Sequence, residues 1–536
     1  MKSVLAANSH TGRSSSSSFF KPQYIRSLAF DGTSGLLFGV GFAGSSPALS
    51  NGVVNCDGRT VFANLHLPQD HEDEIQLMAL SGDLICLSGD FVLDDAVELN
   101  PTATSNVVIR GLEKSSGLGK SSITHPGGQV FRSLYGTDAG WDLTIENLTV
   151  KQSINPVQGY KVLVKNSDFL NNTGVAVYAE AGNLEVSDSY FSGNSGGVLK
   201  AAVDITISKS TFEANVCPVD SSSLNILSLG GTVNATDSTF IDNRTPGEIG
   251  GAIAAATVRV SNSTFDGNSS ADGGAIFAEN VAVKNSTFVN NVASLEGGAI
   301  YAEGGSVYFS TFLNNTASTP PAPDEPGDTP GNAIYKTYGQ EFYVGGNIFA
   351  GGTPTHPQLG FGRSPSPFTD KGGNVFSTPW ETETDIVKDL IVSPTAKDPT
   401  TKFGAEIIDL FGTNTPTLAI FQPNSSGTKT LGLAAGSPAL NAVPQLNWGI
   451  NPDTEAPEPI SRDQRGATRT YPASAGAFEG VVPVTPTPTP TPTTAPAALA
   501  KTGSENPIWV TLAAGSAITV GGLVTYLASR LRRRTS

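Results

Sequence analysis

The most regular pattern in the chain is a phenylalanine that recurs every 21 to 28 residues through its middle. Each copy is preceded two positions earlier by a serine and followed three positions later by an asparagine. The phenylalanines are Phe169, Phe191, Phe212, Phe240, Phe265, Phe288 and Phe312, and the asparagines are Asn172, Asn194, Asn215, Asn243, Asn268, Asn291 and Asn315. Because all seven copies match at both offsets, the pattern indicates a structural repeat.

A short alternating segment precedes each serine and predicts a β-strand with one buried face. Val258-Arg259-Val260, for example, places two apolar side chains on the same side of the strand. Several of the asparagines are followed by two glycines and a second apolar segment, as in Gly273-Gly274-Ala275-Ile276. One unit is therefore a strand, a turn, the Phe segment, an Asn turn, a Gly turn and another strand.

A unit of this size has no second face to bury against, so the units must stack on one another. Short strands and tight turns without a helix-length segment predict an all-β solenoid, a right-handed parallel β-helix. Stacking aligns the phenylalanines into an internal column and the asparagines into a ladder of side-chain amides, while Gly-Gly supplies the positive φ of a corner. We therefore assign these residues to the scaffold. Asn262 and Asn285, which lie in Asn-x-Ser/Thr sequons, are interpreted as turn residues.

The repeat continues in both directions with weaker matches. Val150 takes the Phe position one coil earlier, and residues 107–112 indicate another coil before it. Phe349 and Phe376 mark looser coils downstream, beyond a proline-rich loop at 318–331. The predicted β-helix spans residues 51–480, with its clearest repeats at 160–335.

Two resemblances support this fold. Phe-x-x-Asn together with Gly-Gly-Ala-Ile resembles the repeats of polymorphic outer-membrane proteins, the adhesin-like β-helix surface proteins of chlamydiae, over residues 160–335. The segments at 436–441, 463–466 and 476–479 resemble the closing coil of pectate-lyase-like bacterial surface β-helices. The second resemblance implies that the array ends near residue 480, closed in part by Asp463 and Arg465.

The C-terminal residues 499–536 combine three features of a sorting signal. Leu499-Ala500-Lys501-Thr502-Gly503 is followed by an uncharged run at 507–529, which is long enough to span a membrane, and then by four arginines. A permanent membrane anchor is the alternative. The combination resembles a sortase cell-wall sorting signal, in the Ala-containing variant of high-GC Gram-positive bacteria. The resemblance implies cleavage between Thr502 and Gly503 by sortase and covalent transfer of Thr502 to peptidoglycan.

Two further segments fit a secreted, cell-wall-anchored protein. Residues 481–498 alternate Thr and Pro, which favours either a semi-rigid polyproline II stalk or a disordered linker. Residues 1–50 are interpreted as a signal-peptide region, with an apolar core at 35–43 and cleavage near 43–50. Cys56 and Cys86 either form a disulfide, as suits an exported protein, or are small buried hydrophobic residues like Cys217.

Charge and composition narrow the functional classes. Only 15% of residues are charged and the formal net charge is −16, although both ends are basic. Such a surface repels nucleic acid and anionic membranes, so neither is expected as a partner. No metal-ligand spacing and no phosphate-binding loop stands out, so we predict no cofactor.

Pectate-lyase-like folds also carry enzymes. A lyase requires a basic residue beside carboxylates that hold Ca²⁺, and a glycoside hydrolase requires two carboxylates across the scissile bond. The candidate carboxylates are Asp94, Asp95, Asp237, Asp242, Asp266, Asp272, Glu279, Glu296 and Glu303. They do not recur in one register with a basic partner, so no catalytic residue is assigned. The favoured function is an adhesin or ligand-binding surface protein whose partner is a host or environmental glycan or protein. The alternatives are a polysaccharide lyase or glycoside hydrolase, and a passive stalk or coat. A cleft with carboxylates and a basic residue would favour an enzyme, and a flat or loop-covered face would favour binding.

Overall fold

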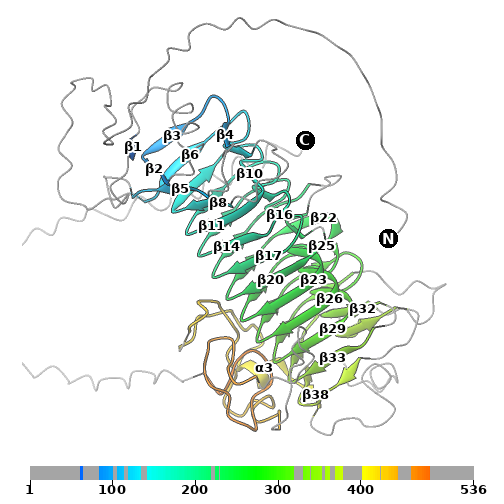
Figure 1. Ribbon diagram of the computed structural model, residues 1–536. Coiled ribbons are helices and arrows are strands. Elements are labelled where there is room, and N and C mark those ends of the chain that lie inside the picture. Colours follow the sequence, from blue (N-terminus) through cyan, green and yellow to red (C-terminus); the bar gives the residue numbers. More distant parts are fainter. Residues whose placement is uncertain are drawn as a thin grey trace, which may run out of the picture. The chain divides into compact units, whose positions relative to one another are not determined.

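The computed structural model describes residues 61–63, 84–99, 106–113, 119–133, 142–218, 224–228, 230–318, 330–337, 340–352, 356–362, 368–377, 401–422, 424–444 and 460–482. All of them belong to one compact unit, residues 56–536. They confirm the predicted all-β repeat fold, a parallel β-helix whose coils stack strand upon strand (Figure 1). The right-handed sense stays a prediction. The expected signal peptide, the Thr/Pro stalk from residue 483 onward and the sorting signal lie outside the described residues.

Three sheets run along the described part of the β-helix, and each strand pairs in parallel with the corresponding strand of the next coil. Sheet A contains two ladders that merge in three long strands, β23 (Ile253–Ser261), β26 (Ile276–Lys284) and β29 (Ile300–Tyr308). The first ladder also contains β1 (Val61–Ala63), β2 (Leu84–Ser88), β5 (Val107–Gly111), β8 (Asp142–Glu146), β11 (Lys161–Lys165), β14 (Leu184–Ser187), β17 (Ile205–Ser208), β20 (Thr232–Thr236), β33 (Phe342–Gly345) and β36 (Thr369–Asp370). The second also contains β4 (Val97–Leu99), β7 (Phe131–Ser133), β10 (Val157–Gly159), β13 (Val177–Ala179), β16 (Leu199–Ala201), β19 (Ile226–Ser228), β32 (Ile334–Lys336) and β35 (Leu359–Phe361).

Sheet B carries the Phe segments, and sheet C is a short sheet beside the Asn turns. Sheet B consists of β3 (Asp90–Val92), β6 (Ser121–Thr124), β9 (Leu148–Lys151), β12 (Asp168–Leu170), β15 (Tyr190–Ser192), β18 (Thr211–Glu213), β21 (Thr239–Ile241), β24 (Thr264–Asp266), β27 (Thr287–Val289), β30 (Thr311–Leu313), β34 (Ile348–Ala350), β37 (Val375–Ser377) and β38 (Lys402–Ala405). Sheet C consists of β22 (Arg244–Ile249), β25 (Ser269–Asp272), β28 (Val292–Ala293) and β31 (Thr316–Ala317).

The phenylalanines of sheet B form one continuous aromatic column inside the β-helix. From Phe169 to Phe312 the rings lie nearly parallel, with neighbouring centroids 4.5 to 5.2 Å apart. Phe349, Phe376 and Phe403 extend the column, and Val150 pairs with Phe169 at its other end. The ring spacing matches the distance between hydrogen-bonded strands, so each ring packs against the next without altering the backbone register.

The asparagines form a buried ladder that hydrogen-bonds each coil to its neighbours. Asn243 accepts the backbone N–H and the side-chain amide of Asn215 at 3.3 and 2.9 Å. Its own amide donates to Asn268 Oδ1 and to the carbonyl of Phe212, each at 2.9 Å. The same pattern repeats along the stack from Asn172. Every polar atom of these buried amides is therefore paired, which removes the cost of burying them.

The serines form a second ladder beside the first, which was not predicted from the sequence. The N–H of Ser238 donates to Ser263 Oγ at 3.1 Å, and Ser263 Oγ donates to the carbonyl of Ser261 at 2.8 Å. Asn347 and Asn374 replace serine in the later coils and keep the ladder intact. The serine two positions before each Phe is thus a coil-to-coil hydrogen-bond acceptor.

Left-handed backbone marks both ends of each repeat strand in sheet B. The position three residues before the Phe has positive φ, as at Asn262 (51°) and Asn285 (48°), and so does the position two residues after it, as at Asn290 (56°). Asn and Asp tolerate this conformation better than other non-glycine residues. The predicted Gly corner is also present, because Gly273 has φ 63° and a Cβ on Gly274 would lie 2.1 Å from the Gly298 oxygen. The two sequon asparagines are therefore corner residues.

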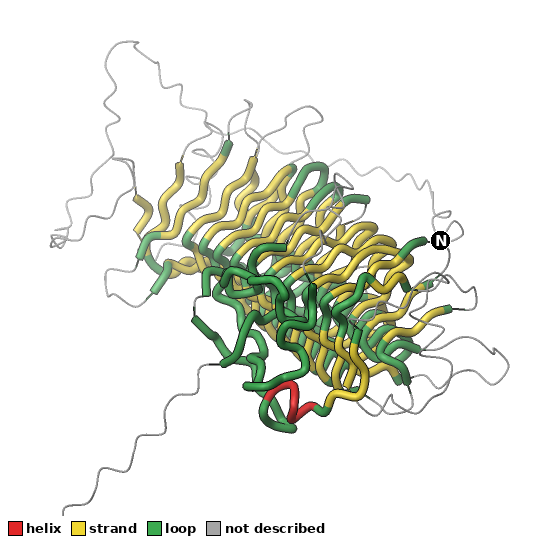
Figure 2. Tube along the Cα trace, turned by 90° about the horizontal axis from the view of Figure 1, so that it is seen from below, coloured by secondary structure: helices red, strands yellow, loops and turns green. Residues whose placement is uncertain are grey.

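Residues 406–482, here called the cap, form no further coil in their described part. The short helix α3 (Ile407–Phe411) follows β38, and the chain then folds back across sheet B as irregular loops (Figure 2). Their apolar side chains form a second core with the outer face of the late sheet B strands, separate from the interior of the β-helix. The segments expected to close the array as a coil therefore cover its side instead.

The structure describes two of the three cysteines but not the candidate membrane span. Cys86 is disulfide-bonded, whereas Cys217 is a buried thiol. Cys56 lies outside the described residues, as does the predicted span at 507–529. Within the part of the chain that the structure describes, no helix is both long and apolar enough to cross a membrane.

We predict that Asn243→Ala lowers the free energy of unfolding by roughly 3 kcal/mol, because it leaves several buried donors and acceptors on two coils unpaired. Asn280→Ala, at an exposed position of β26, is the matched control and should change stability by less than about 0.5 kcal/mol. Urea denaturation followed by circular dichroism measures both. Equal effects of the two substitutions would contradict a stabilising role for the ladder.

Candidate ligand-binding face

The outer face of sheet B is divided by the cap into a covered and an uncovered half. The side chains on either side of each Phe point outward, because side chains alternate along a strand. In the later coils Thr264, Thr287 and Thr311 are only 1%, 0% and 1% exposed, since the cap lies over them. In the earlier coils Thr211 and Thr239, in the same register, are partly exposed. We call the outward side chains of β9, β12, β15, β18 and β21 the open face.

The open face presents a row of polar groups, one set per coil. Asp168 accepts from Lys120 Nζ at 3.0 Å and from Thr149 Oγ1 at 3.3 Å. Tyr190 donates its hydroxyl to Glu213 Oε2 at 2.6 Å, and this hydrogen bond raises the pKa of Tyr190. Hydroxyls, carboxylates and an aromatic ring thus recur at the coil spacing, which suits an elongated ligand lying along the axis.

Gln464 from the cap fixes the border between the two halves. Its amide nitrogen donates to Thr264 Oγ1 and to the Lys429 carbonyl, both at 3.0 Å, and its oxygen accepts from Thr287 Oγ1 at 2.6 Å. Thr287 also contacts Thr430 Oγ1 at 2.8 Å. A buried side chain that bonds two coils and the cap backbone at once holds the cap in one register.

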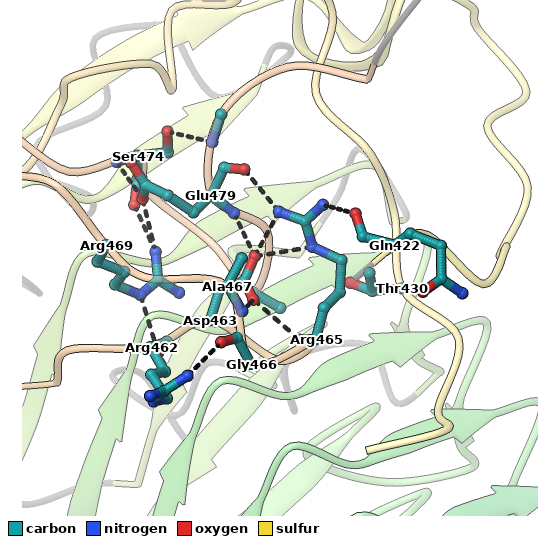
Figure 3. A network of polar contacts seen from close by, with 12 residues as sticks. Gln422, Thr430, Arg462, Asp463, Arg465, Gly466, Ala467, Arg469, Ser474 and Glu479 are labelled. Atoms are coloured by element: carbon teal, nitrogen blue, oxygen red, sulfur yellow. Dashed lines mark hydrogen bonds and ion pairs between the residues drawn. The ribbon is translucent and has the colours of Figure 1, made fainter. Parts of the chain in front are cut away.

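A buried network of charged residues holds the cap itself together (Figure 3). Arg465 donates twice to Asp463 Oδ2, at 2.8 and 2.6 Å, and stacks on the Phe478 ring. Arg469 donates to Glu479 Oε2 at 3.1 Å and to Asn285 Oδ1 at 3.0 Å, which ties the cap to a corner of the β-helix. Burial raises the pKa of Glu479 and the Arg469 guanidinium opposes that rise. The Asp463–Arg465 pair, predicted to close a terminal coil, closes this network.

A pocket of about 300 Å³ lies where the cap meets the open face. Thr239 and Ile241 of β21, Asp266 of β24, and Leu418 and Lys429 of the cap are among its lining residues. It is therefore built from two parts of the chain about 160 residues apart in sequence. A larger hollow at the end of the stack, lined by Lys402, Phe403 and α3, is a wide surface depression.

Most of the carboxylates considered as catalytic candidates lie on different parts of the β-helix, whereas Asp242 lies close enough to Asp266 to raise its pKa. Asp237 and Asp242 occupy left-handed corners on opposite sides of sheet B. Asp272 ends β25, where it accepts the Glu296 N–H at 3.2 Å and burial raises its pKa. The others lie in the turn after β3 (Asp94, Asp95), beside Asp272 (Glu296), and in the long strands of sheet A (Glu279, Glu303).

Of this set, Asp266 is the one that lines the pocket, where a basic residue, Lys429, also lies. Among the described residues, no group of three or more His, Cys, Asp or Glu side chains could hold a metal ion. Sheet B thus presents partly exposed polar side chains in its earlier coils and a pocket at the edge of the cap.

The fold and this face define a β-helix repeat protein with a partly covered sheet. Two segments, 262–279 and 285–303, match the model of the Chlamydia polymorphic membrane protein repeat. The matched segments contain Phe265, Phe288 and the Gly-Gly corners of the central coils. A search of curated proteins found no match to the chain. The similarity covers parts of two central coils, which contribute to the aromatic column and to both polar ladders.

We predict that Arg469→Met destabilises the protein by about 3–5 kcal/mol, because it leaves Glu479 and several buried carbonyls without their donor. The cap should then become sensitive to trypsin at Lys429. Arg462→Met, at an exposed position of the same loop, is the control and should have little effect. Thermal unfolding and limited proteolysis measure the two variants, and an intact, protease-resistant cap in Arg469→Met would contradict this role.

Proposed function

We propose that this chain is a cell-wall-anchored adhesin of a Gram-positive bacterium that binds its ligand on the open face of sheet B. The observation that carries the proposal is the division of sheet B. Its later half is closed by the cap, whereas its earlier half leaves hydroxyl, carboxylate and tyrosine side chains accessible. The match to polymorphic membrane protein repeats supports a surface adhesin built on a β-helix.

The rigidity of the β-helix supports this role. The aromatic column and the two ladders use the repeated Phe, Asn and Ser side chains inside the coils. The outward positions are left free to vary, and they recur at a fixed spacing of about 4.8 Å. A ligand that spans several coils meets a preorganised row of groups, so little entropy is lost in ordering the protein.

The proposed location rests on the C-terminal sequence. Leu499 to Gly503, the uncharged run at 507–529 and the arginine tail resemble a sortase signal. In this proposal the chain is secreted and crosses the membrane transiently. Sortase cleaves it after Thr502 and joins it to peptidoglycan, and the Thr/Pro segment separates the folded part from the wall. Its ligand is a host or environmental glycan or protein.

For the anchor, we predict that Thr502→Ala moves the protein from the wall fraction to the membrane or the medium, because sortase forms its acyl intermediate on Thr502. Thr491→Ala, in the Thr/Pro segment, is the matched control and should leave the wall fraction unchanged. Immunoblots of fractionated cells measure the distribution. An undiminished wall fraction in Thr502→Ala would refute sortase anchoring at this site.

For the open face, we predict that Thr211→Arg reduces adhesion at least tenfold, because a long cationic side chain then projects from within the row. The matched control is Thr206→Arg, on the exposed outer face of sheet A in the same coil. Cells displaying each full-length variant are tested on immobilised glycans and extracellular-matrix proteins. Equal adhesion by both variants would exclude the open face as the ligand-binding surface. Release of sugar products would instead support the lyase or hydrolase alternative.

A further inference from the structure

We propose that the pocket between β21, β24 and the cap binds one neutral sugar residue at the end of a glycan. This inference rests on the proposed function and names the ligand class of the same face. Thr239 and Ile241 belong both to the open face and to the pocket. A glycan whose terminal residue enters the pocket can therefore continue along the row of Thr211, Tyr190 and their neighbours.

The lining combines an apolar wall with a few polar groups, which is the usual composition of a small-molecule site. Ile241, Val289 and Leu418 form apolar parts of the wall. Asp266 and Asn290 supply a carboxylate and an amide, and Lys429 supplies an ammonium group. A sugar ring presents C–H groups on its faces and hydroxyls at its edge, so both kinds of lining find a counterpart.

Asp266 is the residue that indicates a ligand. It stands between Ile241 and Val289 in the column of outward side chains, one coil on either side. The scaffold therefore accepts an aliphatic residue at this position. Burial raises the pKa of the Asp266 carboxyl, and Asp242 adds to the rise, so the charge costs the folded protein stability at neutral pH.

The carboxylate also has capacity to accept further hydrogen bonds. Asn290 donates to Asp266 Oδ1 at 3.3 Å, and no described residue donates to Oδ2. The cap side of the pocket is held in place, because the Lys429 carbonyl accepts from both Thr264 and Gln464. An ionised carboxylate is an acceptor only, so it pairs with hydroxyls. The Lys429 ammonium offsets one negative charge, but Asp242 adds a second beside Asp266, so the local balance stays negative and disfavours acidic sugars. The expected ligand is a neutral hexose or N-acetylhexosamine.

The test uses the full-length chain and ligand-observed NMR titration with methyl glycosides of glucose, galactose, mannose and N-acetylglucosamine, with galacturonate as the acidic counterpart. At least one neutral glycoside should bind, and galacturonate should bind at least tenfold more weakly. Asp266→Val should reduce binding of the neutral glycoside at least tenfold. It should keep or raise the melting temperature at pH 7, with a smaller gain near pH 3, where Asp266 of the parent chain is protonated.

Asp237→Asn is the matched control. Its carboxyl also has a pKa raised by burial and also accepts from an asparagine, but it lies at a corner outside the pocket lining. It should leave sugar binding unchanged. Unaltered binding in Asp266→Val, preference for galacturonate, or no binding of any neutral glycoside would each overturn the proposal. If any of these results is obtained while Thr211→Arg still loses adhesion, the sugar pocket is rejected and the adhesin function is retained.

Discussion

The hydrogen bond from one coil's side chain to the next coil is the interaction on which the rest of the structure depends. A single coil has no partner for its buried amide at Asn243 or for its N–H at Ser238, and only stacking supplies one. The same stacking aligns the Phe rings. Because corner residues and inward residues must satisfy neighbours on both sides, they are fixed by the fold, and variation is confined to outward positions and loops.

A stack of coils has a long exposed side, and the cap uses part of it. The cap has little regular structure of its own, so buried charges and Gln464 take the place of strand pairing. These groups bond neighbours on the cap, on strands β24 and β27, and at the corner residue Asn285. The edge of the cap forms one wall of the pocket and sets where the open face ends. The contacts that attach the cap therefore also position the proposed binding surface.

The fold could be predicted from one sequence because its contacts are local and periodic. Phe265 stacks on residues one coil away, and a residue one coil away lies about 24 positions along the chain. The cap could not be predicted in this way. Gln464 meets Thr264 across 200 residues, and no period connects them. The serine pattern was visible, but its role as an acceptor depends on the corner geometry. The position of Asp266 between Ile241 and Val289 follows from the repeat register and could have been read from it.

The route by which the chain leaves the folded part has a mechanical consequence. The last described residue, Val482, bonds Leu433 within the cap, three positions after Glu479. Tension from the C-terminal side therefore enters through the buried charge network. Gln464 and Arg469 then transmit it sideways into β24 and the corner before β27, in the middle of the stack. Gly476 and Ala477 of the cap also donate to Gly346 and Thr311, and Lys402 of β38 donates to the Pro438 carbonyl. A pull from the cell surface is therefore shared by the cap among several of the later coils.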